Sequence, residues 1–320
     1  MPGALLLGGR ATLGACPEDL RGRGSALFNK ARPCYRKPSF RQRQNRNAGL
    51  GGRSDVKRDL AAMAGKTYDL VIIGGGITGA CIAWDASLRG LSVALMDKGD
   101  FAGATTAASS KLIHGGLRYL INLEIGLVRE SLRERRIWSN IAPHMIDPLT
   151  FIMPMRKHRR LDRLTKAIGL TMYDWLAYDR NRRLDDPAKA IPAHKRLNRA
   201  KTLELEPGLE SDDLIGSMLF HDYQAYSPER LALECILGAV ELGADAANYA
   251  EVVGFLKEEG RVVGVQVDDR SVAGAPEEPY AIRGRLLVNA SGPWADLLMA
   301  RLHDDGGQAG ARHLIRSKGI

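Results

Sequence analysis

The residues best suited to bind a charged ligand lie in a glycine-rich turn. Gly74, Gly76 and Gly79 have the spacing GxGxxG, between a short β-branched run and an apolar segment that ends near Leu88. In a strand–turn–helix unit, the first glycine permits the turn, the second lets the backbone approach a pyrophosphate, and the third lets the helix pack on the strand. The free amides and the positive end of the helix dipole then face the phosphates. The spacing therefore predicts a dinucleotide site.

An acidic residue follows at the position where the ribose of such a ligand would lie. Residues 91–96 are expected to form a second strand, which ends at Asp97. Its carboxylate can accept hydrogen bonds from both ribose hydroxyls. Glycine-rich loops also occur without any ligand, but here the strand, the helix and the acid agree. These features alone do not separate NAD from FAD.

The next stretch, DFAGATTAASSKLIHGGLRYL at residues 100–120, combines small, hydroxyl and basic side chains. Ser109, Ser110 and Lys111 would supply donors around the pyrimidine edge of an isoalloxazine, where negative charge develops on reduction. The glycines after His114 would let the main chain lie flat against the ring. The structural alternative is a helix with its cap on the core, in which the backbone merely satisfies His114.

At this stretch the sequence resembles the FAD-dependent, respiratory glycerol-3-phosphate dehydrogenase family, within the D-amino-acid-oxidase-like flavoproteins. Three later segments match in the same order: APH at 142–144, IGLTMYDWL at 168–176 and LLVNASGPWAD at 286–296. The resemblance runs from about Tyr68 to Lys318. It implies oxidation of sn-glycerol 3-phosphate to dihydroxyacetone phosphate, with FAD as cofactor and quinone as electron acceptor. An oxidase that passes electrons to oxygen is the alternative enzyme.

The resemblance also implies roles for single residues. By the resemblance, Arg118 would lie in the substrate pocket near Tyr119 and His114. Its guanidinium suits phosphate, or the oxygen on the carbon being oxidised, and keeps its charge. His114 is the natural base for the C2 hydroxyl proton by its intrinsic pKa, although a structural or flavin-packing histidine explains it equally well. No metal site is expected. The expected cofactor-binding residues, of which the last two rest on the resemblance, are Gly74, Gly76, Gly79, Asp97, Thr105, Ser109, Ser110, Lys111, Gly115, Gly116, Val252 and Gly292.

The order of the predicted elements gives the fold class. We expect an α/β fold, an FAD-binding Rossmann-like parallel sheet with an antiparallel meander, interrupted by a partial α+β substrate cap. This layout favours FAD over NAD. The predicted elements are strands at 69–73, 91–96, 245–249 and 286–289, helices at about 77–88 and 228–242, a hairpin around KEEGR at 257–261, and a strand-like PLTFIMPM at 148–155.

Four regions follow from these elements and the composition. Residues 1–66 are expected to be a disordered basic extension, 67–144 and 221–305 a discontinuous FAD-binding domain, 145–220 the cap, and 306–320 the start of a truncated continuation. Met63 is the preferred biological start, with a targeting segment as the alternative. A truncated, non-catalytic fragment of such a flavoenzyme is the hypothesis from a different class.

Charge and composition exclude other classes. The net charge of the 320 residues is +9, but residues 1–66 hold 14 Lys and Arg against 4 Asp and Glu, which leaves the rest near neutral. A nucleic-acid-binding domain would carry its positive charge on the folded surface, so no nucleic acid is expected as a partner. The four cysteines form no CxxC pair, which excludes a zinc ribbon and a dense disulfide framework.

A membrane surface is the remaining partner considered. No segment has the ~20 apolar residues of a spanning helix. Residues 156–184 mix basic and apolar side chains, which suits an amphipathic helix on anionic lipid and equally a basic solvated face over ordinary core. The family resemblance implies a cytoplasmic protein peripherally associated with the inner (cytoplasmic) membrane. The oligomeric state is not predicted.

Overall fold

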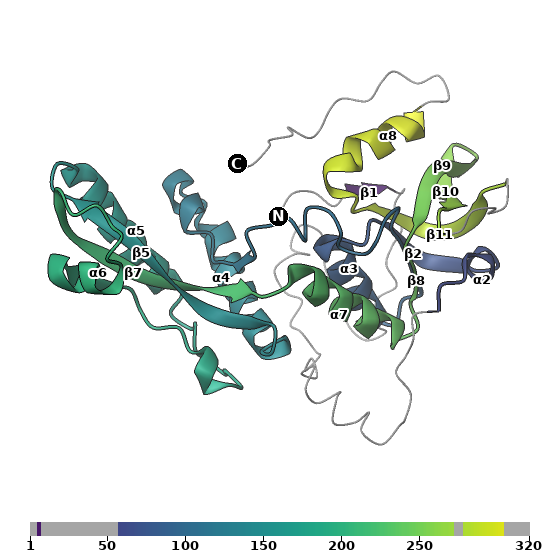
Figure 1. Cartoon of the computed structure of the whole chain (residues 1–320). Coiled ribbons are helices and arrows are strands. Elements are labelled where there is room, and N and C mark those ends of the chain that lie inside the picture. The colour runs from purple at the N-terminus through teal and green to yellow at the C-terminus, as the bar shows by residue number, and fades with distance from the viewer. Residues whose placement is uncertain (1–4, 8–56, 272–277, 304–320) are drawn as a thin grey trace, which may run out of the picture. The chain divides into compact units, whose positions relative to one another are not determined.

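The structure, a computed structural model, describes residues 5–7, 57–271 and 278–303. These residues divide into two compact units (Figure 1). The first contains residues 5–7, 57–109 and the described part of 228–303, and the second contains residues 110–227.

The first unit is built on a mixed sheet in the strand order β8-β3-β2-β11-β10-β9, and its first four strands are parallel. Helix α3 covers β2 and β3 and lies beside α7 (Figure 1). The sequence VALM of β3 is buried at every position, as a strand covered on both faces requires. This confirms the predicted parallel sheet. Its elements are β2 (Thr67–Ile73), α3 (Ile77–Leu88), β3 (Val93–Met96), α7 (Pro228–Val240), β8 (Asp245–Ala247) and β11 (Tyr280–Asn289).

The predicted meander forms one edge of this sheet, next to the parallel strands. Strands β9 (Ala250–Glu258) and β10 (Arg261–Asp269) are antiparallel and joined at Glu259 and Gly260, which have φ of 50° and 74°. Strand β10 pairs antiparallel with β11, which also pairs with the short β1 (Leu5–Leu7). A 3-10 turn η3 (Gly292–Trp294) and helix α8 (Ala295–His303) follow β11.

The prediction that residues 1–66 form a disordered extension is wrong in the part that the structure describes. Helix α2 (Leu60–Ala64) buries Leu60 and Met63 in the core of the first unit. Just before it, Arg58 binds Asp269 through two hydrogen bonds of 3.0 and 2.5 Å, which lower the pKa of Asp269 to about 2. The prediction rested on the composition of residues 1–66, and two buried apolar side chains and one ion pair do not change that composition noticeably. The rest of the extension lies outside the described residues.

The second unit is a small antiparallel sheet with helices. Strand β5 (Ile146–Arg156) pairs with β7 (Leu214–Ala225) along their whole length, and the short β4 (Leu112–Ile113) and β6 (Lys195–Asn198) also pair with β7. Helices α4 (Ile125–Ile141) and α5 (Arg160–Leu176) enclose a core with the 3-10 turn η1 (Leu117–Asn122). The remaining elements are η2 (Pro187–Lys189) and α6 (Arg199–Leu205).

The units divide the chain at other positions than the predicted boundaries 144/145 and 220/221. The breaks fall after Ser109 and after Ser227, so residues 110–144 and 221–227 belong to the second unit. The physical reason is long-range pairing, because β4 bonds to β7 and Leu132 of α4 packs against Tyr173 of α5. Such contacts join segments far apart in sequence, which motif order does not reveal. The predicted continuation 306–320 lies outside the described residues.

Candidate functional site

The carboxyl ends of β2 and β11 are the first place to expect a ligand. The chain leaves β2 through α3 to β3 on one side, whereas β11 pairs with β2 on the other side. In open α/β sheets, ligands bind outside the carboxyl ends of the strands where the strand order reverses in this way. The turns after the two strands, residues 74–76 and 290–292, therefore define the candidate site.

The three glycines of the motif differ in how much room the surrounding chain leaves for a side chain. Gly74 has φ +109°, and a Cβ there would lie 2.5 Å from the carbonyl oxygen of Ala290. A Cβ on Gly79 would lie 1.9 Å from the carbonyl oxygen of Gly74. Gly76 instead has an ordinary φ of −72°, and the nearest atom to its Cβ would be the Thr106 hydroxyl oxygen at 3.2 Å. No backbone atom of the described chain requires a glycine at 76, so its bare Cα leaves an open approach to the start of α3.

Thr106 is a residue of this turn that the sequence analysis missed. Its hydroxyl oxygen accepts a hydrogen bond of 3.0 Å from the backbone N–H of Ile77, the first residue of α3. The predicted residue, Thr105, is exposed. Two adjacent threonines gave the signal, but the sequence could not show which of them faces the helix.

Asp97 ties the end of β3 to the glycine turn. Its Oδ2 accepts a hydrogen bond from the Gly75 N–H at 2.7 Å, and its Oδ1 accepts one from the Gly99 N–H at 2.9 Å. Burial raises the pKa of this carboxyl group, while the two amides act in the opposite direction. Each carboxylate oxygen keeps a further lone pair, so both can still accept a ribose hydroxyl. Gly75 was also missed, and a Cβ there would lie 2.5 Å from the ring of Phe101.

A buried asparagine organises the turn after β11. Asn289 is 1% exposed, and its Oδ1 accepts hydrogen bonds from the N–H and the hydroxyl of Ser291 at 3.2 and 2.6 Å. Its Nδ2 donates to the carbonyl oxygen of Ala295 at 3.1 Å. Gly292, with φ +56°, begins η3 within this turn. Gly292 is thus part of the turn after β11, and its contact with a cofactor stays a prediction.

Val252 lies elsewhere in the first unit, on β9. It is buried, and its carbonyl oxygen accepts a hydrogen bond of 2.5 Å from Arg301. Strand pairing joins it to Val267. Contact of its main chain with an adenine ring stays a prediction.

The segment that ends in HGGLRYL does not form the helix proposed as the structural alternative. Residues 112–113 are strand β4, Gly116 has φ +75°, and η1 follows. Ser109, Ser110, Lys111, His114 and Arg118 are exposed, whereas Tyr119 is half-buried and packs against the core of the second unit. Their contacts with flavin or substrate stay predictions.

His114 is hydrogen-bonded in a way that bears on its role. Its Nδ1 accepts a hydrogen bond of 3.1 Å from the N–H of Gly116. With Nδ1 as acceptor, the neutral ring carries its proton on Nε2 and presents a donor to the outside. The role of His114, as a base or as a structural histidine, stays a prediction.

Packing inside the protein explains why residue 115 is a glycine. A Cβ there would lie 2.3 Å from Leu132 Cδ2 and 2.3 Å from the Tyr173 hydroxyl oxygen. Gly115 is buried against α4 and α5, so its lack of a side chain is required by packing whether or not a ring lies nearby.

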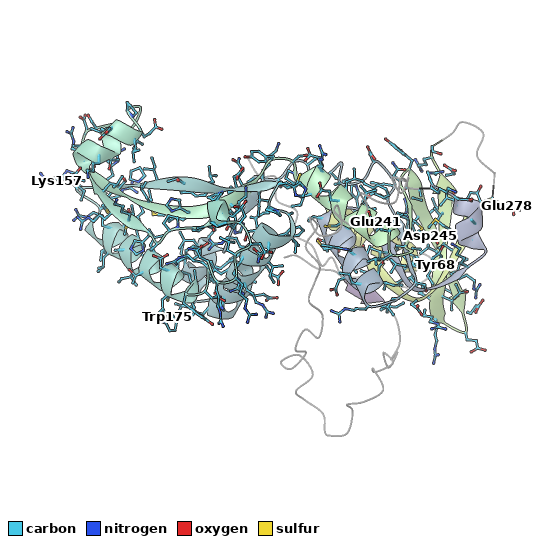
Figure 2. All side chains as sticks on the ribbon, turned by 90° about the horizontal axis from the view of Figure 1, so that it is seen from below. Tyr68, Lys157, Trp175, Glu241, Asp245 and Glu278 are labelled. Atoms are coloured by element: carbon cyan, nitrogen blue, oxygen red, sulfur yellow. The ribbon has the colours of Figure 1, made fainter. Side chains whose placement is uncertain are left out.

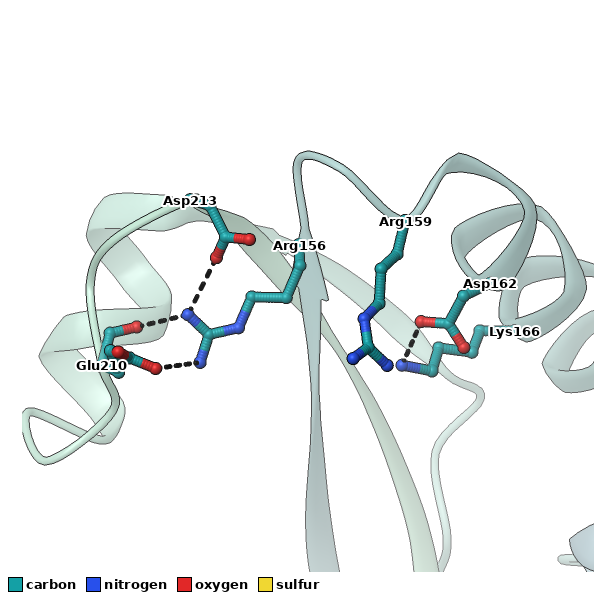
Figure 3. A pocket seen from close by; sticks show the side chains of 6 residues that line it. All are labelled: Arg156, Arg159, Asp162, Lys166, Glu210 and Asp213. Carbon is teal, nitrogen blue, oxygen red and sulfur yellow. Dashed lines mark hydrogen bonds and ion pairs between the residues drawn. The ribbon is translucent and has the colours of Figure 1, made fainter.

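A polar pocket lies at the end of β5 and the start of β7, and none of the predicted site residues lines it (Figure 3). Arg156 binds Asp213 at 3.0 Å and approaches Glu210 at 3.7 Å, and Lys166 binds Asp162 at 2.7 Å. Arg159 completes the lining, so the pocket holds equal numbers of cations and anions. It lacks the net charge that an anionic substrate would need.

Helix α5 presents an apolar stripe to its surroundings. Leu161, Leu164, Ile168 and Trp175 are 82%, 58%, 58% and 73% exposed, and their spacing places them along one face of the helix. Figure 2 shows the Trp175 side chain directed away from the helix. Among the described residues, no helix is both long and apolar enough to cross a bilayer.

Comparison with known proteins identifies the relatives of the chain. Residues 69–319 match the family model described as FAD dependent oxidoreductase. The chain is 38% identical to the aerobic glycerol-3-phosphate dehydrogenase of Bacillus subtilis over 269 residues, which cover 83% of this chain and 45% of that protein. It is 43% identical to a glycerol-3-phosphate dehydrogenase of Mycobacterium leprae over 234 residues, 73% of this chain and 37% of that protein. The chain thus spans less than half the length of these curated relatives.

Two solved structures are similar to this chain in fold. The glycerol-3-phosphate dehydrogenase of Bacillus halodurans, complexed with FAD, superposes with a TM-score of 0.55 at 32% identity, over 76% of this chain and 38% of that one. L-proline dehydrogenase from P. horikoshii has a TM-score of 0.58 at 20% identity, over 74% of this chain and 56% of that one, a likeness in fold.

Proposed function

Because the chain belongs to the FAD dependent oxidoreductase family, we propose that it oxidises sn-glycerol 3-phosphate to dihydroxyacetone phosphate, with FAD as the hydride acceptor. We call the turns at 74–76 and 290–292, together with Asp97, the cradle. The observation that carries this proposal lies in it: Gly76 has no side chain, although no backbone atom of the described chain would clash with a Cβ there. The similarity to glycerol-3-phosphate dehydrogenases supports the choice of substrate.

The residues of the cradle fit a dinucleotide. The Ile77 N–H already donates to Thr106, so the next amides in the first turn of α3, with the positive end of its dipole, would bind a pyrophosphate. Asp97 stands at the end of the neighbouring strand with acceptor capacity left for a ribose. Gly292 and the Asn289-bonded turn lie across β2 from Asp97, because β2 pairs with β3 and with β11. Together these groups would hold the adenosine and pyrophosphate parts of FAD.

The substrate would be held by charge. When bound, FAD supplies an acceptor for the hydride that leaves C2 of the substrate. Arg118 would bind the phosphate group with two parallel N–H donors. The C2 hydroxyl proton would pass to solvent water, because the Nδ1 of His114 is already engaged by the Gly116 N–H. We therefore assign His114 a role in orientation, with Tyr119 beside Arg118 on η1.

The direct test uses the intact protein, purified and scanned for flavin absorbance. We expect a yellow protein that reduces a soluble quinone analogue when sn-glycerol 3-phosphate is added. Release of hydrogen peroxide in place of quinone reduction would make the protein an oxidase. A colourless protein without turnover would contradict the proposal and favour a non-catalytic fragment.

We further propose that the protein meets the cytoplasmic face of the inner membrane, where quinone is found, through the stripe on α5. The stripe follows a basic segment in which Lys157 and Arg159 are exposed, the combination that binds anionic lipid surfaces, whereas Arg156 is paired with Asp213. We expect the protein to sediment with phosphatidylglycerol vesicles and to be released by salt. The double variant Leu161→Ser/Leu164→Ser should remain in the supernatant. Equal sedimentation of the variant would remove α5 from the contact.

A further inference from the structure

We propose that Tyr173, supported by Asp222 and Arg135, is a positioning residue that fixes the turn at Gly115 and Gly116 and thereby the start of η1, which carries Arg118. The effect on the turn follows from the second unit alone. The effect on turnover rests on the proposed function.

The contacts converge on a single backbone amide. The N–H of Gly115 donates to the Tyr173 hydroxyl oxygen at 2.9 Å and to Asp222 Oδ1 at 3.2 Å. The Tyr173 hydroxyl in turn donates to the same Asp222 oxygen at 2.8 Å. Arg135 forms an ion pair with this oxygen and also donates to the carbonyl oxygen of His221 at 3.3 Å. The turn is thus bonded directly to α5 and β7, and through Asp222 to α4.

Burial makes this arrangement rigid. Tyr173, Asp222 and Arg135 are 3%, 3% and 2% exposed. Burial raises the pKa of the Tyr173 hydroxyl well above its ordinary value, with the Asp222 charge acting in the same direction. The phenol therefore stays protonated at any physiological pH and can donate to Asp222 while it accepts from Gly115. Hydrogen bonds in such surroundings are costly to leave unmade.

The turn passes this constraint on to η1. Gly116 is the residue before η1 and has φ +75°, and its carbonyl oxygen accepts the N–H of Tyr119 at 2.9 Å. The direction of η1, and with it the place of Arg118, is therefore set by the backbone at 115 and 116. A Cβ at Gly115 would collide with the Tyr173 hydroxyl, so the main chain lies directly against the group that holds it.

The test compares two variants that each remove one buried phenol oxygen. In Tyr173→Phe, Gly115 loses an acceptor. In the control Tyr68→Phe, a 2% exposed tyrosine on β2 of the first unit loses its hydrogen bond to Asp245. The readouts are hydrogen exchange of peptides covering residues 112–120, bound FAD, and kcat and KM for glycerol 3-phosphate.

We expect Tyr173→Phe to speed exchange at 112–120 by about fivefold to tenfold, as the loss of one ordinary hydrogen bond predicts. Its kcat/KM should fall by more than the control's, with equal flavin content and an equal melting temperature. The same exchange rate at 112–120 in both variants would overturn the proposal, as would a loosened turn with unchanged kinetics.

Two further measurements keep the outcome decisive. If Tyr173→Phe does not fold, the Gly115 amide of the unmodified protein should still be among the slowest to exchange in its unit, and fast exchange there would contradict the proposal. An unmodified protein that binds flavin but does not turn over glycerol 3-phosphate would refute the proposed function, while the exchange data would still decide the role of Tyr173.

Discussion

Gly76→Val should abolish the retention of FAD and leave the protein folded. The backbone at Gly76, with φ −72° and ψ −179°, is open to any residue, and the Thr106 hydroxyl is the near contact of a new Cβ. A branched side chain at the start of α3 would occupy the space in which the pyrophosphate must approach the helix amides. Flavin absorbance after desalting, together with the circular dichroism spectrum, measures both halves of this expectation.

Two other glycines serve as controls for this variant. Gly65→Val places the same side chain where the nearest atom is the Ala62 carbonyl oxygen at 3.6 Å, away from the cradle, so flavin should be retained. Gly79→Ala places a methyl group 1.9 Å from the Gly74 carbonyl oxygen, so folding and flavin should be lost together. Normal flavin content in Gly76→Val would show that the turn does not bind the pyrophosphate.

The parallel sheet could be predicted from the sequence because its signals are local. Strands β2 and β3 are short runs of apolar residues bounded by glycine turns, and the hairpin around Gly260 has turn residues between two β-rich runs. Gly74 and Gly79 have the roles that the motif predicts, since each leaves no room for a side chain. The family match over residues 69–319 agrees with this interpretation.

The parts that could not be predicted depend on partners distant in sequence. Asp222 bonds to the Gly115 amide across 107 residues, and no local pattern distinguishes it from other acids on strands. The same applies to Arg58, whose partner Asp269 is 211 residues away. In the candidate site, Asn289 and Thr106 act through short-range bonds, but their importance depends on where the turn places them. Periodicity and spacing do not contain this information.

Arg118→Ala is expected to leave FAD bound and to lower kcat/KM for glycerol 3-phosphate by about a hundredfold or more. The side chain is exposed on η1 and does not belong to the dinucleotide cradle, so cofactor binding should be unaffected. Its removal costs two charge-assisted hydrogen bonds to the phosphate group, each worth about 1.5–3 kcal/mol. Because phosphate is bound in the ground state as well as the transition state, much of the loss should appear as a higher KM.

A matched arginine separates this effect from a general loss of positive charge. Arg133 is exposed on α4 of the same unit, and Arg133→Ala removes the same side chain from a different element. We expect near-normal kinetics for Arg133→Ala, and Arg118→Lys should recover only part of the loss because an ammonium group cannot form the bidentate contact. Steady-state kinetics at fixed ionic strength distinguishes the three variants. Unchanged kinetics in Arg118→Ala would show that the guanidinium of Arg118 does not bind the substrate.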